Sequence, residues 1–244
     1  MTSLHVVHLF PSELGINGDV GNVTAIRRRA TAYGLDVKTS VLGRGDELPI
    51  DVDLVHIGSG PTAELALVLP ELVRHSSRLQ SLRDSGVPFL AISAGWFGLG
   101  QRVKFQSGEW HAGAGVFPTE TQLLSSRVVG EIAIETQWGT VTGFENHSAL
   151  MSDGGLTHFG RVTHGTGSDP QAPKSDRWEG VVMGSSIGTN VHGSLLPMNP
   201  VVADHLILSA VRRTDPSWSI PHTDALAKLD AFAAKSREAV LGRL

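Results

Sequence analysis

The stretch FLAISAGWFGLG, residues 89–100, joins a short apolar run to a cluster of small residues. The apolar run ends at Ile92, and Ser93, Ala94 and Gly95 follow it directly. Such a run is typical of a buried strand, and small residues after it permit a sharp strand-to-helix turn. The turn would present the Ser93 hydroxyl at the carboxyl end of the strand, where open α/β sheets place their sites. The stretch therefore predicts an α/β protein with a candidate nucleophile at Ser93.

The segments before this stretch alternate between strand and helix patterns. Apolar runs predict strands at residues 4–10, 35–41 and 52–57. After the first strand, an apolar stripe at helical spacing predicts a helix with Asn22 as its N-cap. A second helical stretch covers residues 62–85, and Pro70 is expected to interrupt it. This order is typical of a mixed, largely parallel sheet flanked by helices.

The second half of the chain is richer in extended segments. Strands are predicted at residues 128–134, 139–144, 181–183 and 187–191. The Gly-, Ser- and Pro-rich residues 165–177 predict a long exposed loop, and helices are predicted from Pro200 to about residue 213 and at about 224–241. No linker-like stretch interrupts the pattern, so we expect residues 1–244 to form a single domain.

The composition limits the kinds of partner. The chain has 244 residues, with 20 Lys and Arg against 24 Asp and Glu, a formal net charge of −4 and 41% hydrophobic residues. This balance is ordinary for a globular protein and argues against a surface for nucleic acid or anionic membranes. No apolar run is long enough for membrane insertion, so we expect a cytoplasmic protein.

The sequence contains no cysteine. Disulfides, thiolate metal sites and a cysteine nucleophile are thereby excluded. His5 and His8 lie three apart on a predicted strand, so they point to opposite faces and cannot share one metal ion. We therefore expect no metal site.

Three predicted strand ends carry residues suited to acyl transfer. They are residues 58–60 (Gly-Ser-Gly), residues 93–95 (Ser-Ala-Gly) and His192. Ser93 is a candidate nucleophile and His192 a candidate base, while N–H groups after Ser93 and in the glycine turn are candidate oxyanion donors. The residues alone leave a second interpretation open, in which the glycine turn and the histidine are purely structural.

Residues 89–100 resemble the nucleophile turn of the class I glutamine amidotransferases, within their CobB/CobQ-like group. Within that group, the residues resemble the GatD subunits of lipid II isoglutaminyl synthases. Further resemblance lies in NGDVGNV at 17–23, GSG at 58–60, GFENH at 143–147 and GTNVHGSLL at 188–196. These segments keep the order of the family over about residues 5–210. The resemblance implies the flavodoxin-like amidotransferase fold.

The resemblance also implies roles for individual residues. Ser93 would attack the carboxamide of glutamine, His192 would act as general base and acid, and Arg127 would hold the substrate. The implied oxyanion hole is formed by the backbone of Gly58, Ser59, Gly60 and Ala94.

A partner is implied as well. Ammonia from glutamine would pass to a subunit resembling the Mur ligase MurT, which would use ATP and Mg to activate a carboxylate. The product would be an amidated glutamate in the peptidoglycan precursor lipid II. The chain itself would need no cofactor.

Several residues depart from the family pattern. Ser93 stands where the family has its cysteine nucleophile, Ala94 where it has glycine and Phe97 where it has glutamine. Ser194, two residues after His192, is not the acidic residue that orients the histidine in many class I enzymes. Three hypotheses follow: an active amidotransferase subunit, a catalytically degenerate binding or regulatory scaffold, and a Ser93/His192 serine hydrolase. The first and third hypotheses require Ser93 to support catalysis, and the second does not.

Overall fold

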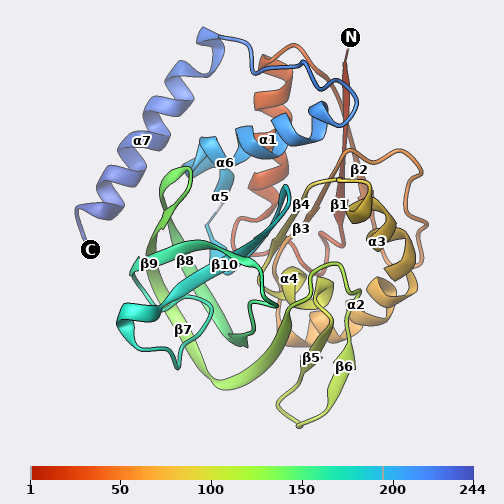
Figure 1. Ribbon diagram of the computed structural model, residues 1–244, viewed down its shortest axis with the longest axis vertical. Coiled ribbons are helices and arrows are strands. Elements are labelled where there is room, and N and C mark those ends of the chain that lie inside the picture. Colours follow the sequence, from red (N-terminus) through yellow and green to blue (C-terminus); the bar gives the residue numbers. More distant parts are fainter. Residues whose placement is uncertain (1, 194) are drawn as a thin grey trace.

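A computed structural model describes residues 2–193 and 195–244, and its centre is one mixed sheet (Figure 1). The parallel half contains, in spatial order, β2 (Asp36–Leu42), β1 (Ser3–Leu9), β3 (Leu54–Ile57), β4 (Phe89–Ile92) and β11 (Ser186–Thr189). The antiparallel half continues with β10 (Trp178–Met183), β9 (Thr157–His164), β7 (Glu120–Thr136), β8 (Gly139–Met151) and β12 (Val191–His192). The predicted mixed α/β sheet is confirmed, and four of the five parallel strands come from the first half of the chain, where helices α1 to α4 also lie.

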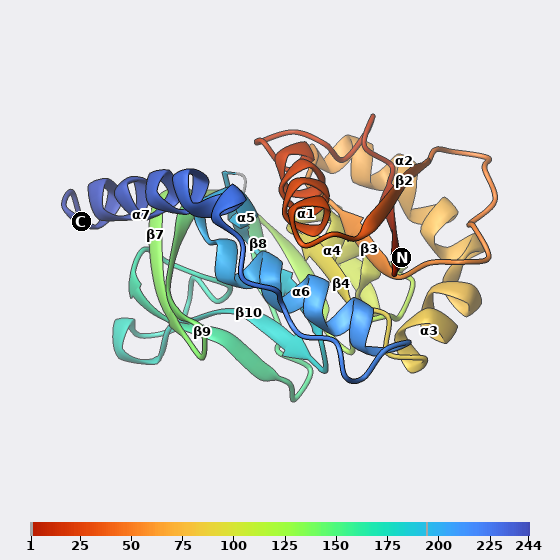
Figure 2. The same cartoon turned by 90° about the horizontal axis from the view of Figure 1, so that it is seen from above.

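Helices cover both faces of the parallel half (Figure 2). Helices α1 (Val20–Ala32) and α6 (Pro200–Arg212) pack on one face, and α2 (Thr62–Arg74) and α3 (Ser76–Asp84) pack on the other. Successive residues of β1 divide between the two cores, since Leu4 and Val6 belong to the α1 side and Val7 and Leu9 to the α2 side. This alternation is the period of two that a strand imposes on its side chains.

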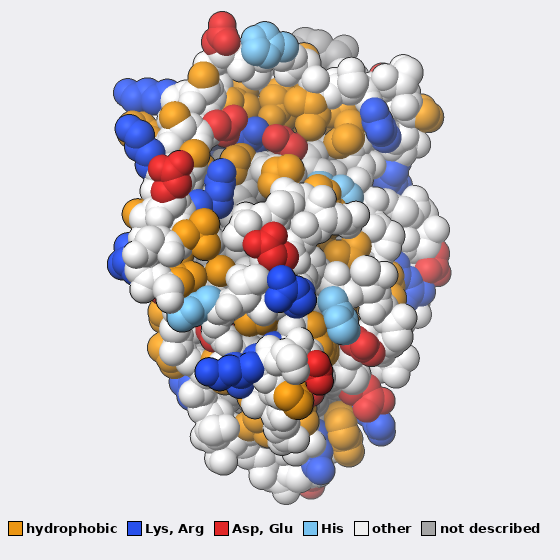
Figure 3. Space-filling view, turned by 60° about the vertical axis from the view of Figure 1, so that its left-hand side comes forward, with side chains coloured by type: hydrophobic (Ala, Val, Ile, Leu, Met, Phe, Trp, Pro, Cys, Tyr) orange, Lys and Arg blue, Asp and Glu red, His pale blue; other side chains and the backbone are white. Residues whose placement is uncertain are grey.

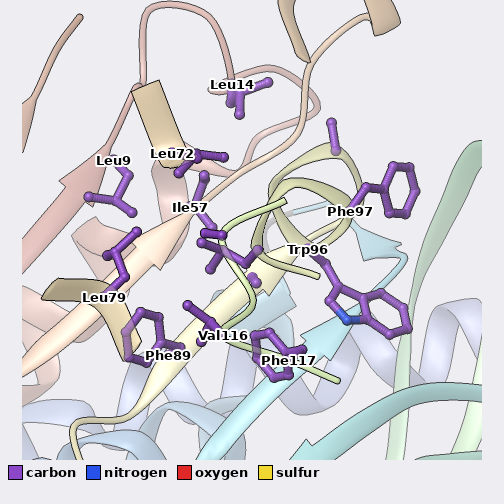
Figure 4. Close-up of a cluster of buried hydrophobic side chains, with 14 of the residues drawn as sticks. Leu9, Leu14, Ile57, Leu72, Leu79, Phe89, Trp96, Phe97, Val116 and Phe117 are labelled. Atoms are coloured by element: carbon purple, nitrogen blue, oxygen red, sulfur yellow. The ribbon is translucent and has the colours of Figure 1, made fainter. Parts of the chain in front are cut away.

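The core on the α2 side extends under the helix that follows β4. Figure 4 shows Leu9, Ile57, Phe89 and Phe117 grouped with Trp96, which lies on α4 (Ala94–Leu99). Trp96 is fully buried, and its indole approaches Gly188 of β11 so closely that a Cβ there would lie 2.5 Å from Nε1. Glycine at position 188 therefore lets α4 seat against the sheet.

The C-terminal part of the chain closes the α1 side. After the short helix α5 (Leu195–Met198) and α6, a 3₁₀ turn (Asp224–Leu226) leads into α7 (Ala227–Leu241). Arg29 of α1 is buried and binds both Asp204 of α6, at 2.7 Å, and Asp230 of α7, at 2.5 Å. On the face shown in Figure 3, acidic and basic side chains are interspersed with hydrophobic ones. Within residues 2–193 and 195–244, no helix is both long and apolar enough to cross a membrane.

Several local predictions need correction. Helix α2 continues through Pro70, and the break with α3 falls at His75 instead, because Leu69 and Leu72 hold the helix against the core. Helix α1 begins at Val20 with Asp19 as its N-cap, so Asn22 lies inside the helix, where its Oδ1 accepts a hydrogen bond from Leu196 N at 2.9 Å.

The second half holds more strand than expected. The hairpin of β5 (Arg102–Lys104) and β6 (Trp110–Ala112) and the strand β9 were not predicted, and β7 and β8 extend beyond their predicted bounds. The loop at 165–177 is exposed only in part, since Gly167 and Ser168 are buried and a 3₁₀ turn forms at Lys174–Asp176. The helices predicted to begin at Pro200 and at 224 are confirmed.

The close contact between α4 and β3 gives a test of this packing. Gly95 N donates a hydrogen bond to Gly58 O at 3.0 Å, and a Cβ at position 95 would lie 2.5 Å from that oxygen and 2.7 Å from the Ile57 side chain. We expect Gly95→Ala to lower the free energy of unfolding by about 2 kcal/mol, because the clash with backbone cannot be relieved by a rotamer change. Urea denaturation measures the difference.

Gly130→Ala is the matched control, since a Cβ at position 130 of β7 meets nothing within 4 Å. Equal denaturation midpoints for the two variants would contradict this account.

Candidate active site

Ser93 lies at the junction between β4 and α4 in a left-handed backbone conformation. Its φ is 47° and its ψ is −114°, which is rare for a residue other than glycine and is typical of a strained nucleophile turn. Ser93 N donates to Thr189 O at 2.8 Å, and Phe97 N donates to Ser93 O at 2.8 Å. The predicted strand-to-helix turn is therefore present at Ser93.

A cleft of about 210 Å³ opens above this turn. Five of the candidate residues line it: Ser59, Gly60, Ser93, Ala94 and Arg127. Ser93 is only 5% exposed, so it lies at the base of the cleft rather than on the surface. Gly58 and His192 lie outside the lining, although both belong to neighbouring strand ends.

His192 is fully buried on the two-residue strand β12, opposite Phe144 of β8. Its Nδ1 lies 3.7 Å from Asp19 Oδ2. Among the described residues, neither ring nitrogen has a hydrogen-bond partner, so His192 is not hydrogen bonded to Ser93. Ser194, noted in the sequence for its lack of an acidic group, lies outside the described residues.

Asp19 is a buried carboxylate that the sequence analysis did not select. It precedes α1, is 0% exposed, and its Oδ2 accepts hydrogen bonds from Ser59 N at 2.8 Å and Ser59 Oγ at 2.6 Å. The Ser59 N–H is thus committed to this carboxylate. Ala94 is the first residue of α4, where the N–H has no acceptor within the helix. The Ala94 N–H is therefore available towards the cleft, which Ala94 lines.

A second histidine, His147 of β8, also lines the cleft. It is buried, both ring nitrogens lack hydrogen-bond partners among the described residues, and burial lowers its pKa to about 4. His147 is therefore neutral at neutral pH. Glu145 Oε2 lies 4.0 Å away and is held by the N–H groups of Thr166 and Gly167, at 2.8 and 2.9 Å from the carboxylate oxygens.

Arg127 lies where the pairing of β7 with β8 shifts register, between Leu123 and Val128. Irregular positions of this kind redirect a side chain relative to the strand. The Arg127 side chain lines the cleft, and its Nε donates to Asn146 Oδ1 at 2.7 Å. The guanidinium is thereby oriented by a neighbour and keeps further N–H groups for an anionic group.

Across the described part of the chain, no group of three His, Asp or Glu side chains is arranged to hold a metal ion.

Comparison with known proteins places this arrangement in a family. Residues 6–200 match the CobB/CobQ-like glutamine amidotransferase domain. The chain belongs to this family. The segments that match include the Ser93 turn, the 58–60 turn and the His192 strand end.

Individual relatives agree with the assignment. The chain is 30% identical to the GatD subunit of lipid II isoglutaminyl synthase (glutamine-hydrolyzing) from Staphylococcus aureus, over 95% of this chain and 94% of that one. It is 26% identical to the corresponding subunit from Streptococcus pneumoniae, over 86% of this chain and 81% of that one. The glutaminase domain of Trypanosoma brucei CTPS, solved with bound acivicin, superimposes with a TM-score of 0.53 at 11% identity, covering 91% of this chain and 99% of that one. That structure supports the amidotransferase fold alone.

In this amidotransferase domain, the buried carboxyl group of Glu179 binds the segment that is hydrogen bonded to the Ser93 turn. Glu179 of β10 is 0% exposed and accepts hydrogen bonds from Thr189 Oγ1 at 2.7 Å, Asn190 N at 2.5 Å and Ser168 Oγ at 2.7 Å. Burial raises its pKa from 4.5 to about 7, and the three hydrogen bonds oppose that rise. Because Thr189 O also binds Ser93 N, this carboxyl group supports the segment that holds the turn.

The raised pKa of Glu179 has a measurable consequence for stability. Between pH 4.5 and 7 the folded state keeps a proton that the unfolded state has lost, so this group's contribution to stability is largest at low pH and is lost as the pH rises through 7. We expect the difference in free energy of unfolding between the parent and Glu179→Gln to fall by about 2 kcal/mol from pH 5 to pH 8. Denaturation curves at several pH values measure it.

Glu109→Gln, at an exposed position between β5 and β6, should show no such trend. A pH-independent difference for Glu179→Gln would overturn the assignment of the raised pKa.

Proposed function

We propose that this chain hydrolyses glutamine and supplies the ammonia to a Mur-ligase-like partner that amidates glutamate in lipid II. Family membership and the similarity to two GatD subunits of glutamine-hydrolysing synthases support the proposal. The observation that carries it is the strained turn at Ser93, which puts a hydroxyl at the base of a cleft of about 210 Å³. Glutamine is the substrate, and the chain requires no cofactor of its own.

The reaction would begin with attack of Ser93 Oγ on the side-chain carboxamide. A C–O bond forms, the Ser93 proton passes to His192, and the carbonyl oxygen becomes an oxyanion stabilised by N–H groups such as that of Ala94. His192 then gives its proton to the leaving nitrogen, ammonia departs, and an ester of Ser93 remains. Water, deprotonated by His192, hydrolyses the ester to glutamate and restores Ser93.

This sequence requires His192 to come within hydrogen-bonding distance of Ser93. Catalytic hydrogen bonds are often long in the absence of substrate and shorten in the reacting complex. Arg127, oriented by Asn146, would bind the α-carboxylate of glutamine through charge-assisted hydrogen bonds. His147, which is neutral and lines the cleft, would hydrogen bond the substrate from the cleft wall.

The ammonia would be used by the partner. The proposed ligase subunit resembles MurT and would activate the acceptor carboxylate with ATP and Mg, so the cofactors belong to that subunit. Ammonia release measured on the chain alone and together with this partner tests the proposal. Absence of glutamine hydrolysis in both settings would reject it.

The absence of a hydrogen bond between His192 and Ser93 favours one alternative function. In that alternative the chain is a catalytically degenerate scaffold that binds the ligase and regulates it. A serine hydrolase acting through Ser93 and His192 is the other alternative, and it predicts labelling of Ser93 by a fluorophosphonate probe. The substitution series below separates the three.

Substitutions at position 93 give the decisive comparison. We expect Ser93→Ala to abolish glutamine hydrolysis, and Ser93→Cys to increase it at least tenfold, because a thiol ionises near pH 8.5 and is far more nucleophilic than a hydroxyl. Ammonia release at saturating glutamine measures both. Equal amidation by the parent complex and by the complex containing Ser93→Ala, in both cases from ammonium and not from glutamine, would instead favour the scaffold.

Arg127 should affect substrate binding more than chemistry. We expect Arg127→Ala to raise KM for glutamine by about tenfold or more, the usual effect of losing a hydrogen bond to a charged group, with a smaller change in kcat. Steady-state kinetics measure both constants. Arg44→Ala, in an exposed turn, is the control. An unchanged KM in Arg127→Ala would remove Arg127 from the substrate site.

A further inference from the structure

His192 and Asp19 are two buried side chains that face each other without a completed hydrogen bond. Asp19 Oδ2 lies 3.7 Å from His192 Nδ1, and both side chains are fully buried. Asp19 Oδ1 and both ring nitrogens of His192 lack hydrogen-bond partners among the described residues. Buried polar atoms are almost always paired, so this group of unsatisfied atoms requires an explanation.

The position of Asp19 is fixed by its own turn and by two other segments, the one after β3 and the one after β12. Ser59 N and Oγ both donate to its carboxylate, and the backbone of Gly58 comes so close that a Cβ there would lie 2.8 Å from Asp19 Cβ. Asn17 and Gly18 have left-handed backbones, with φ of 59° and 82°, and turn the chain into α1. Gly193 N, next to His192, donates to Asn17 O at 3.2 Å, so the turn that carries Asp19 is tied to the segment that carries the histidine.

Among residues 2–193 and 195–244, Asp19 has no permanent counter-charge within 4.0 Å. Within 4.0 Å, in the part of the chain that the structure describes, His192 is the basic side chain that Asp19 meets. His8 and His56 lie on the adjacent strands, and burial lowers the pKa of both, so they remain neutral. His147 faces His192 from β8 and is neutral as well. A buried carboxylate is costly unless paired, and the N-terminus of α1 offsets only part of that cost.

We propose that Asp19 is the positioning residue that orients His192, accepting a hydrogen bond from Nδ1–H so that Nε2 is unprotonated and available to Ser93. This rests on the proposed function, in which His192 is the base. Asp19 then stabilises the imidazolium that forms when His192 takes the Ser93 proton, as the carboxylate does in serine hydrolases. The acidic member of the site thus comes from 173 residues before the histidine in the sequence, because Asp19 and His192 differ by that number of positions.

The tautomer of His192 in the full-length protein tests the pairing independently of any activity. In protein with ¹⁵N-labelled histidine, nitrogen shifts identify which ring nitrogen carries the proton, and loss of one signal in His192→Gln assigns His192. We expect the Nδ1–H tautomer in the parent protein. In Asp19→Asn we expect the preference for Nδ1–H to weaken and the Nε2–H tautomer to appear, because an uncharged amide oxygen holds the Nδ1 proton less strongly than a carboxylate and the NH₂ group can donate to Nδ1 instead.

Kinetics provide the second readout. If glutamine hydrolysis is present, Asp19→Asn should lower kcat by roughly a hundredfold or more with little change in KM, as expected for a base held in the wrong tautomer. Asp53→Asn is the matched control, since Asp53 Oδ2 also accepts a backbone N–H, that of His5, at 2.8 Å, away from the site. The control should keep the parent tautomer at His192 and the parent kcat.

The outcomes separate this inference from the proposed function. The expected tautomers in a protein that hydrolyses no glutamine would support the pairing and reject the function. Glutamine hydrolysis with His192 as the Nε2–H tautomer in the parent would reject the pairing and leave the function standing. If Asp19→Asn fails to fold by circular dichroism, the tautomer of the parent protein still decides, and Nε2–H there overturns the inference.

Discussion

Ser93 has a backbone φ of 47°, a conformation that costs a residue other than glycine about 1–3 kcal/mol, so its neighbours must hold it in place. They do so through hydrogen bonds on both sides. Ser93 N binds Thr189 O of β11, and Gly95 N binds Gly58 O at the end of β3. The conformation of Ser93 therefore depends on three strands, and any change that separates β3, β4 and β11 would allow the turn to relax.

The same three strands bring the rest of the site together. Gly58 and Ser59 follow the end of β3. Gly58 leaves room for the Asp19 side chain because it has no side chain of its own, and Ser59 donates two hydrogen bonds to the Asp19 carboxylate. Because β1 lies beside β3, the turn after β1 brings Asp19 to this end of the sheet. Parallel strands place their carboxyl ends at one edge, so segments far apart in the sequence meet there.

The strand ends of the site could be predicted from the sequence, whereas a buried residue within a turn, Asp19, could not. The turn at Ser93 depends on residues next to it, so an apolar strand followed by small residues was enough to predict it. Asp19 depends on long-range contacts with Ser59 and His192, and a single Asp in a glycine-rich turn gives no sign of burial. The family resemblance did include the turn at 17–23, but it assigned no role to the carboxylate.

Errors in the fold prediction have a similar origin. Pro70 removes one backbone donor from α2, yet burial of Leu69 and Leu72 offsets that loss, and only the tertiary structure contains this information. The short strands β5 and β6 are too brief to show a clear alternation, and the exposed face of β6 gives no apolar signal.

Serine at position 93 changes what the rest of the site must provide. A cysteine can be converted to thiolate before substrate arrives, whereas a serine hydroxyl loses its proton only during attack, so the base must be correctly placed at that moment. Ser93 is hydrogen bonded to the segment of residues 189–192, which ends in His192, because Thr189 O binds Ser93 N. Glu179 holds this segment through hydrogen bonds from Thr189 Oγ1 and Asn190 N, just before β12. The separation of Ser93 from His192 is thus set by residues 189–192 and by one buried carboxyl group. A serine enzyme would depend on this segment more strictly than a cysteine enzyme, because a misplaced base cannot be compensated by a nucleophile that is already ionised.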